Sequence, residues 1–334
     1  MLKPLIIRLA SMIVTLIGVA IVVFVLIRVA PGNPIAMMLP PGASDQDIAQ
    51  LVALYGLDKS LFQQFIIWAS GVLQGDFGTS IVLRQPVLGL VLDRLPATLE
   101  LSFLALFIAV AIGGVTAIWG ARERGRSPEA AVDLFNGAAL SIPDFLWALV
   151  FILLFGVVWP VFQISGRISP HLDLPFSTQF YLFESIFRLR FDLLGNLLNH
   201  MLMPALSLAL PLAAIVSQLL KQGLKDVLQL DYTVLARVRG FTETQVILRE
   251  ALRNAVLPTL TLVGVQFTFL IGGTVIVERI FSYEGLGNMA IDAVINRDLP
   301  LIQGIVLMFA LLFIFVNLAV DIAYTFLNPR LRHG

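Results

Sequence analysis

The chain has 334 residues, 58% of them hydrophobic and only 13% charged, with a formal net charge of zero and a mean hydropathy of +0.91. Soluble domains carry about a quarter charged residues, so this composition predicts a multispanning membrane protein. The balanced charge indicates no nucleic-acid partner. The absence of cysteine excludes disulfides and thiolate chemistry, and the three widely separated histidines lack the spacing of a metal site.

Six stretches are apolar enough over roughly 20 residues to cross about 30 Å of hydrocarbon. The first follows Lys3 and Arg8 as a signal peptide would. Its apolar part is longer than a signal core and no small-residue cleavage pattern follows, so we expect a retained span. The predicted fold class is all-α, a polytopic membrane protein with six transmembrane helices. They are placed near residues 9–29, 99–119, 143–163, 201–220, 256–277 and 301–326.

The basic residues predict the orientation of these spans. Thirteen of the 22 Lys and Arg residues fall in the N-terminal tail, the 120–134 loop, the 220–255 loop and the C-terminal tail. Because basic residues concentrate on the cytoplasmic side of membrane proteins, both termini and the 220–255 loop are predicted to be cytoplasmic. The long connections near 30–98 and 164–200 are then external. We expect them either to pack at the membrane interface or to dock an external partner.

Polar side chains inside the predicted spans are candidates for a solute path. Asn317 and Asp321 lie four residues apart on one face of the last span. An ionised aspartate at a helix centre costs about 2.5–3.5 kcal/mol on insertion scales. Asp321 is close to the cytoplasmic end, so we favour its pairing with Arg330 or with the cytoplasmic loop over a proton relay. Gln266 in the fifth span and Asp144 at the start of the third are weaker candidates.

The stretch from Asp231 to Pro258 differs from its apolar surroundings and predicts a folded loop on the cytoplasmic face. A short helical pattern ends near Gly240, a residue suited to end one helix and start another at an angle. Thr242 precedes a second helical pattern that runs up to Pro258. Two short helices joined at a glycine would form a rigid element, which is suited to transmitting a movement of another protein. The alternative is a basic loop held at the lipid headgroups.

Motifs for nucleotide hydrolysis and for other catalysis are missing from the sequence. A Walker A loop needs a glycine directly before its lysine, whereas the four lysines follow Leu2, Asp58, Leu220 and Leu224. No GxSxG, HExxH or GxGxxG motif in a strand–helix context is present either. We therefore expect no catalytic residues. The energy for uphill transport would come from an ion gradient or from a separate ATPase.

A dozen short motifs, in order along nearly the whole chain, resemble one known family. They include Pro31-Gly32-Asn33-Pro34, Gly75-Asp76-Phe77-Gly78-Thr79-Ser80, Thr98-Leu99-Glu100, Ser141-Ile142-Pro143-Asp144-Phe145, Ser165-Gly166-Arg167, Asp231-Tyr232 with Ala236-Arg237, Glu278 with Ile280-Phe281-Ser282, Gly285-Leu286-Gly287, Arg297-Asp298 and Asn328-Pro329-Arg330. The chain is similar to inner-membrane permease subunits of bacterial ATP-binding-cassette importers in the peptide/nickel group. It looks most like the first of the two permeases in dipeptide and oligopeptide systems.

The resemblance implies a type I importer permease fold. A segment at 1–98 would hold the first helix and an external stretch, and 99–334 would form a five-helix core. The loop at 221–258 would be the EAA-type loop, whose short coupling helix seats in a groove of the cytoplasmic ATPase. We expect its apolar side chains, Val238 included, to anchor the helix there and its two arginines to add charge contacts. The residues matching the coupling helix are Asp231, Tyr232, Val234, Leu235, Ala236, Arg237, Arg239, Gly240 and Phe241.

The resemblance also implies partners and a cargo. The partners are a second homologous permease in a heterodimer, two ATPase subunits that bind ATP and Mg, an external solute-binding protein and the lipid of the bacterial inner membrane. This chain would hold no cofactor itself. Short peptides are the expected cargo, and nickel chelates and glutathione-like compounds remain alternatives, because specificity in this family rests largely on the binding protein. Gln266, Asn317 and Asp321 are the candidate polar residues of the path.

Two rival functions fit the sequence less well. A stand-alone secondary transporter or channel would need functional charges at the membrane midplane and internal repeats, and the sequence shows neither. A purely structural assembly subunit would not need so developed a coupling loop.

Overall fold

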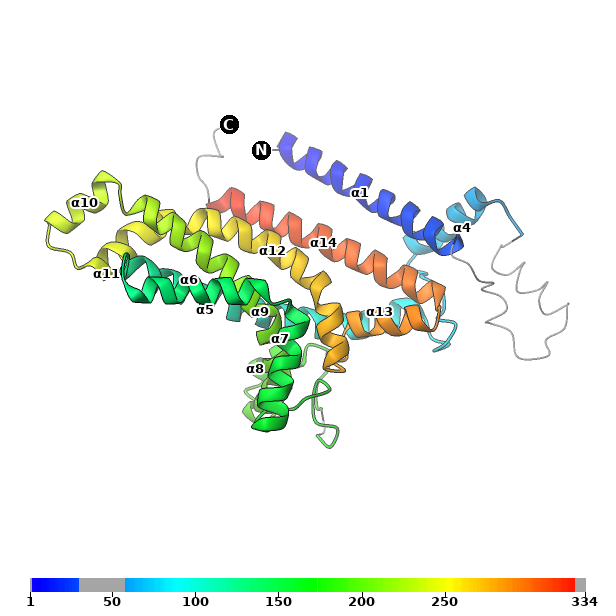
Figure 1. Cartoon of the computed structure of the whole chain (residues 1–334). Helices are drawn as coiled ribbons and strands as arrows, with labels where there is room; N and C mark the ends of the chain where they lie inside the picture. The colour runs from blue at the N-terminus through cyan, green and yellow to red at the C-terminus, as the bar shows by residue number, and fades with distance from the viewer. Residues whose placement is uncertain (1, 30–57, 173, 328–334) are drawn as a thin grey trace. The chain divides into compact units, whose positions relative to one another are not determined.

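The computed structural model describes residues 2–29, 58–172 and 174–327 (Figure 1). The regular elements in these ranges are helices, apart from an isolated β-bridge between Thr79 and Pro86. The predicted all-α class is therefore confirmed for the described part of the chain. The helices are α1 (Leu2–Val29), α4 (Leu61–Leu73), α5 (Val87–Arg122), α6 (Ser127–Ser141), α7 (Asp144–Phe151), the π-helical η1 (Ile152–Val158), α8 (Tyr181–Phe187), α9 (Phe191–Val227), α10 (Asp231–Val238), α11 (Glu243–Gln245), the π-helical η2 (Val246–Ala251), α12 (Leu252–Ile280), α13 (Leu286–Ile295) and α14 (Leu299–Leu327).

Four helical segments of the described chain are long and apolar enough to cross a membrane. They are α5, α9, the continuous run Glu243–Ile280 that ends in α12, and α14. They confirm the predicted spans at 99–119, 201–220, 256–277 and 301–326. The described apolar part of α1, Ala10–Leu26, is shorter than the other candidates. The count of six spans therefore stays a prediction.

The predicted third span at 143–163 coincides with α7 and η1, but the helix ends at Val158, and α6 precedes it outside the predicted range. The chain turns between α6 and α7, and the two directions differ by 101°. Pro143 explains the break, because a proline disfavours helical geometry in the residue before it. Ile142 accordingly has extended torsion angles, φ −103° and ψ 120°. Counted together, the bent pair is a fifth candidate span.

The chain divides into two compact units, and each is described by itself. The first comprises Met1–Leu95 and Met289–Ile314. Within it, α4 begins at a capping box in which Ser60 and Gln63 exchange side-chain and backbone hydrogen bonds. Asp298 accepts hydrogen bonds from the Ser80 hydroxyl at 2.5 Å and from the Val82 amide at 3.1 Å. The domain boundary expected near residue 98 stays a prediction.

The second unit comprises Pro96–Asn288 and Phe315–Gly334. Helix α9 packs against α6, α7 and α12 and carries much of the buried apolar surface. The sequence pairs Gly113–Gly114 and Gly272–Gly273 predict close helix contacts. The prediction is confirmed at Gly113, where a Cβ would lie 2.6 Å from the Ala213 carbonyl oxygen. It is wrong within this chain at Gly272, which has no described atom within 4 Å of that position.

Some sequence features lie outside the described residues. They are the motif Pro31–Pro34, the first part of the long connection near 30–98, the side chain of Asp321 and the C-terminal motif at 328–330.

Candidate functional site

The short helix α10 ends where the sequence predicts, at a glycine. Gly240 has a φ of +87°, a left-handed conformation that other residues adopt only with strain. Its amide donates a hydrogen bond to the Arg237 carbonyl at 2.9 Å, and the Phe241 amide donates to the Ala236 carbonyl at 3.2 Å. These two bonds form a Schellman motif, which terminates the helix at a fixed angle.

Local hydrogen bonds join α10 to the elements on both sides. Thr242 caps the next helix through a capping box with Gln245, which confirms the predicted helix start. The Arg237 guanidinium donates to both carboxylate oxygens of Glu243, at 3.0 and 2.8 Å, and to the Leu228 carbonyl at 3.1 Å. This arginine therefore supports the loop from within. Its expected charge contact with a partner stays a prediction, as does that of the exposed Arg239.

The inner face of α10 rests on a buried apolar core. Thr233 is fully buried and Ala236 is nearly so, and the Thr233 hydroxyl lies 2.7 Å from the Leu230 carbonyl, to which it donates. The core beneath them draws on α5, α9, η2 and α12, so α10 is held by the same residues that hold the spanning helices together. It consists of Ala117, Ala121, Leu220, Leu224, Leu228, Ala236, Val246, Ile247, Ala251 and Ala255.

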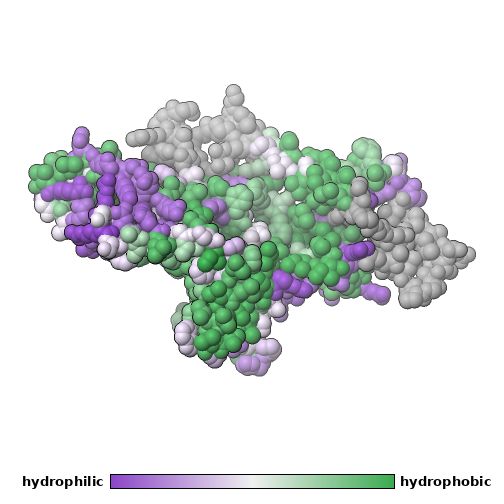
Figure 2. All heavy atoms as spheres, in the orientation of Figure 1, coloured by the Kyte–Doolittle hydropathy of each residue, from purple (hydrophilic) through white to green (hydrophobic). Residues whose placement is uncertain are grey.

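The outer face of α10 is apolar and exposed. We use the name α10 face for Tyr232, Val234, Leu235 and Val238. Their exposed fractions are 37%, 48%, 49% and 79%. Figure 2 shows apolar surface beside hydrophilic surface at this end of the unit. Residues spaced three and four apart share one side of a helix, and here that side faces outward. Contiguous exposed apolar surface of this kind marks an interaction site.

A second feature is an open pocket of about 250 Å³ at the break between α6 and α7. Asp144 borders it from the start of α7, Leu212 from α9, and Gln266 from α12. The structure brings both weaker candidates for a solute path, Gln266 and Asp144, to this pocket. Asn317 is half-buried in α14 and is not part of the pocket lining, and the side chain of Asp321 is outside the described residues.

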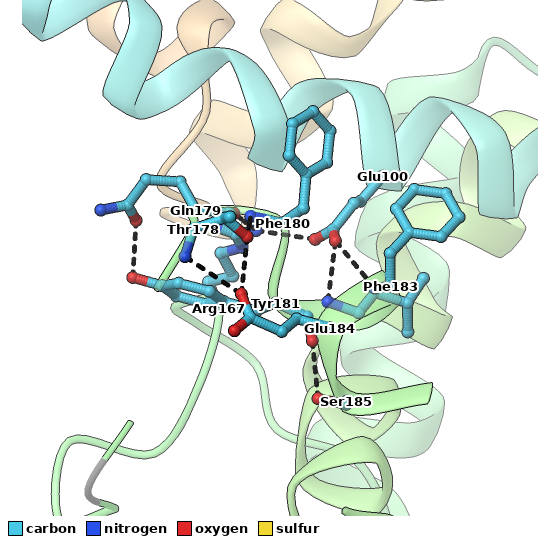
Figure 3. A network of polar contacts seen from close by, with 10 residues as sticks. Glu100, Arg167, Thr178, Gln179, Phe180, Tyr181, Phe183, Glu184 and Ser185 are labelled. Atoms are coloured by element: carbon cyan, nitrogen blue, oxygen red, sulfur yellow. Dashed lines mark hydrogen bonds and ion pairs between the residues drawn. The ribbon is translucent and has the colours of Figure 1, made fainter. Parts of the chain in front are cut away.

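A buried ion pair holds the segment between η1 and α9 to α5, as Figure 3 shows. Arg167 Nη2 lies 2.7 Å from Glu100 Oε2, and the two side chains are 5% and 0% exposed. Glu100 Oε1 accepts hydrogen bonds from the Leu182 amide at 2.7 Å and the Phe183 amide at 3.1 Å. The Arg167 guanidinium also lies over the Tyr181 ring, 4.0 Å from its centroid. One carboxylate thus fixes both the Arg167 turn and α8.

A second buried carboxylate joins α12 to the start of α13. Glu278 Oε1 accepts a hydrogen bond from the Thr98 hydroxyl at 2.7 Å, and that hydroxyl accepts one from the Leu286 amide at 2.8 Å. A Cβ at Gly285 would lie 2.3 Å from Glu278 Oε2, so only glycine fits there. The sequence presents these residues as separate motifs. Their pairing was missed because Thr98 and Glu278 are 180 positions apart.

Comparison with known proteins assigns the chain to a family. Residues 101–333 match the family described as binding-protein-dependent transport system inner membrane component. The chain belongs to this family. Residues 1–102 match the N-terminal part of the membrane component of such systems. The predicted resemblance to permease subunits of ATP-binding-cassette importers is confirmed, and a stand-alone secondary transporter is set aside.

Curated relatives of this inner membrane component cover almost the whole chain. It is 38% identical over 330 residues to the dipeptide transport system permease protein of Escherichia coli K12, covering 98% of this chain and 97% of the relative. It is 35% identical over 327 residues to the di/tripeptide permease of Pseudomonas aeruginosa UCBPP-PA14, with the same coverage. The glutathione transport system permease of Salmonella typhimurium LT2 matches at 35% over 327 residues, again covering 98% and 97%.

Proposed function

We propose that this permease subunit imports short peptides across the bacterial inner membrane, driven by two separate ATPase subunits. The observation that carries the proposal is the α10 face, an exposed apolar surface on a helix with a rigid, fully packed base. A partner that closes on nucleotide needs such a surface to push against. ATP and Mg belong to those partners, since none of the lysines in this chain follows a glycine as a Walker A loop requires.

The supports of α10 explain how a push becomes transport. The helix shares its core with α5, α9 and α12, and the Arg237–Glu243 pair joins it to the start of the run that continues as α12. Movement of α10 is therefore passed to the spanning helices as a rigid-body rotation. Together with a second, homologous permease, these helices would open a central path to alternate sides. The distribution of basic residues supports a cytoplasmic position for the termini and the α10 loop.

Peptides are the favoured cargo because two of the relatives are named for dipeptide or di/tripeptide transport. Glutathione is the second candidate, since a glutathione permease matches at 35% over the same share of the chain. It is itself a tripeptide with one unusual linkage, so one path would suit both. The nickel-chelate alternative stays a prediction.

The test is to purify the tagged chain from its native membrane and reconstitute what co-purifies. The proposal predicts a second permease and Walker-motif ATPases in the preparation. With the co-encoded binding protein and ATP, the liposomes should accumulate labelled L-alanyl-L-leucine. Accumulation of glutathione but not of the dipeptide would select the second candidate. A chain that stays alone and moves solute without ATP would contradict the proposal.

A further inference from the structure

The pocket at the α6–α7 break lies halfway along two spanning helices. Leu212 of α9 and Gln266 of α12 both border it. Gln266 is at the centre of α12 (Leu252–Ile280), and Leu212 falls in the middle third of α9 (Phe191–Val227). The 101° bend brings Asp144, the first residue of α7, to the same level. A carboxylate within a membrane protein at this depth is costly and usually functional.

The two polar side chains of this pocket have hydrogen-bonding capacity left over. Asp144 Oδ1 accepts a hydrogen bond from the Phe145 amide at 2.8 Å, in the first turn of α7. Within the described part of the chain, neither Asp144 Oδ2 nor the Gln266 amide has a hydrogen-bond partner, and no cation pairs with Asp144. Oδ2 lies 3.8 Å from the Cβ position of Gly273, where a larger residue would cover it.

The remaining lining decides the chemistry of the ligand. Apolar side chains such as Leu208, Ile215 and Phe269 form the walls, and no Lys or Arg borders the pocket. One carboxylate and one amide among apolar walls complement an ammonium group that carries a hydrogen-bonding backbone and an apolar side chain. The pocket offers no cation that could bind a free carboxylate of the ligand.

We propose that this pocket binds the amino-terminal end of a transported peptide, with the α-ammonium on Asp144 Oδ2 and the first peptide group on Gln266. The inference rests on the proposed function and assigns this subunit a cargo site of its own, in addition to the selection made by the binding protein. Because Gly273 has no side chain, the ammonium group of the peptide has room to approach Asp144 Oδ2.

The substitution that tests it is Asp144→Asn in the complete transporter. Asparagine keeps an oxygen acceptor for the Phe145 amide, so this local hydrogen bond is retained and only the charge is removed. In liposomes with the binding protein and ATP, we expect uptake of L-alanyl-L-leucine to fall about tenfold, the effect of losing one charge-assisted hydrogen bond. ATP hydrolysis without peptide should be unchanged. Gly273→Ala should reduce uptake less, and Gly272→Ala, which meets no described atom within 4 Å, is the matched control.

A binding measurement separates occupancy from turnover. Because the chain has no cysteine, Ile215→Cys places a single thiol of this subunit in the pocket wall. Millimolar L-alanyl-L-leucine should slow its reaction with a small maleimide in the assembled transporter, and N-acetyl-L-alanyl-L-leucine should not. Adding Asp144→Asn should abolish the protection.

Several outcomes would overturn the inference. A wild-type transporter that imports the dipeptide, with an Asp144→Asn variant that imports it equally fast, would refute the cargo site alone. A thiol at position 215 that is never labelled would show that a partner subunit covers the pocket, which also refutes it. A wild-type transporter that hydrolyses ATP but imports no peptide would instead refute the proposed function, and with it this inference.

Discussion

The α10 loop and the segment around Arg167 are both short stretches folded back on spanning helices of one unit, yet they are attached differently. Helix α10 contributes Ala236 to a buried apolar core of ten residues and makes several local hydrogen bonds. The segment around Arg167 is tied to α5 by one buried carboxylate, Glu100, which binds Arg167 and two backbone amides of α8. Exposed or half-buried hydrogen bonds, such as those between Ser169 and Asn196, add to it. The apolar attachment is spread over many similar contacts, whereas in the polar attachment the buried charge is concentrated at Glu100.

The difference teaches where each region tolerates change. Many small apolar contacts give α10 a stiff base, and no single contact decides its position. The outer side chains of α10 can therefore contact a partner, and substituting them should have little effect on the stability of the fold. A buried ion pair behaves oppositely, because removing one partner leaves the other charge buried and uncompensated.

The largest effect is expected from Arg167→Met. It leaves the Glu100 carboxylate buried without its cation and should destabilise the protein by about 3–5 kcal/mol. Thermal unfolding of the purified protein, followed by circular dichroism, measures the loss. The double variant Glu100→Gln with Arg167→Met should recover part of it, because no charge is then left buried. A single variant as stable as the wild type would contradict the concentrated attachment.

A smaller loss is expected from Gly240→Pro, at the end of α10. Proline fixes φ near −65° and has no amide hydrogen, whereas this position needs φ +87° and donates to the Arg237 carbonyl. We expect a cost of about 2–3 kcal/mol, confined to the loop, and loss of ATP-driven uptake while the chain still inserts. Gly240→Ala, which has room for its methyl group, should cost about 1 kcal/mol and retain most uptake. Normal uptake by the proline variant would refute the rigid connection.

A charge on the α10 face should separate function from stability. Leu235 is 49% exposed, so Leu235→Asp should change stability by no more than about 0.5 kcal/mol. An aspartate at the centre of an apolar contact should nevertheless weaken ATPase binding by about 30-fold, the size of a typical hot-spot effect. Co-purification of the ATPase and peptide uptake are the two readouts. Leu73→Asp, at a position 88% exposed on α4, is the matched control and should leave both nearly unchanged.

The smallest effect is a dependence of the local stability of residues 177–184 on pH. The Thr178 hydroxyl, which donates a hydrogen bond to Glu184, and the neighbouring amides lower the pKa of this carboxyl to about 2. The unfolded value is about 4.3, so the carboxylate stabilises the segment above that pH and loses this contribution as the pH falls toward 2. The protection factors for hydrogen exchange at residues 177–184, which are corrected for the intrinsic rate at each pH, should therefore fall between pH 5 and about 2. Glu184→Gln should show lower protection throughout and lack this pH response.

Local signals predict the α10 loop well. Gly240 and Thr242 act on their immediate neighbours, and a glycine at a helix end or a threonine before a helix has the same meaning in most sequences. The four straight spans follow equally from long apolar runs. The break at Pro143 has a local signal too, but an average of hydropathy over 20 residues does not register it.

The polar contacts of the second unit could not be predicted because their partners are distant in sequence. Glu100 and Arg167 are 67 positions apart, and each belongs to a motif that has no meaning by itself. Asp144 and Gln266 are also distant in sequence, and they border the same pocket only because the chain bends after α6. The contact predicted at Gly272 is not found within this chain for a related reason. A pair of glycines indicates that a helix can be approached closely, but it does not indicate which helix approaches.

The central claim, that the α10 face seats the ATPase, is tested most directly by cross-linking. The chain has no cysteine, so Val238→Cys gives this subunit one thiol, at a position that is 79% exposed. Loaded with a thiol-directed photo-crosslinker in the active transporter, it should join to the ATPase. Leu73→Cys, at a position 88% exposed on α4, should not. A transporter that imports peptide while the thiol at position 238 never reaches the ATPase would contradict the account.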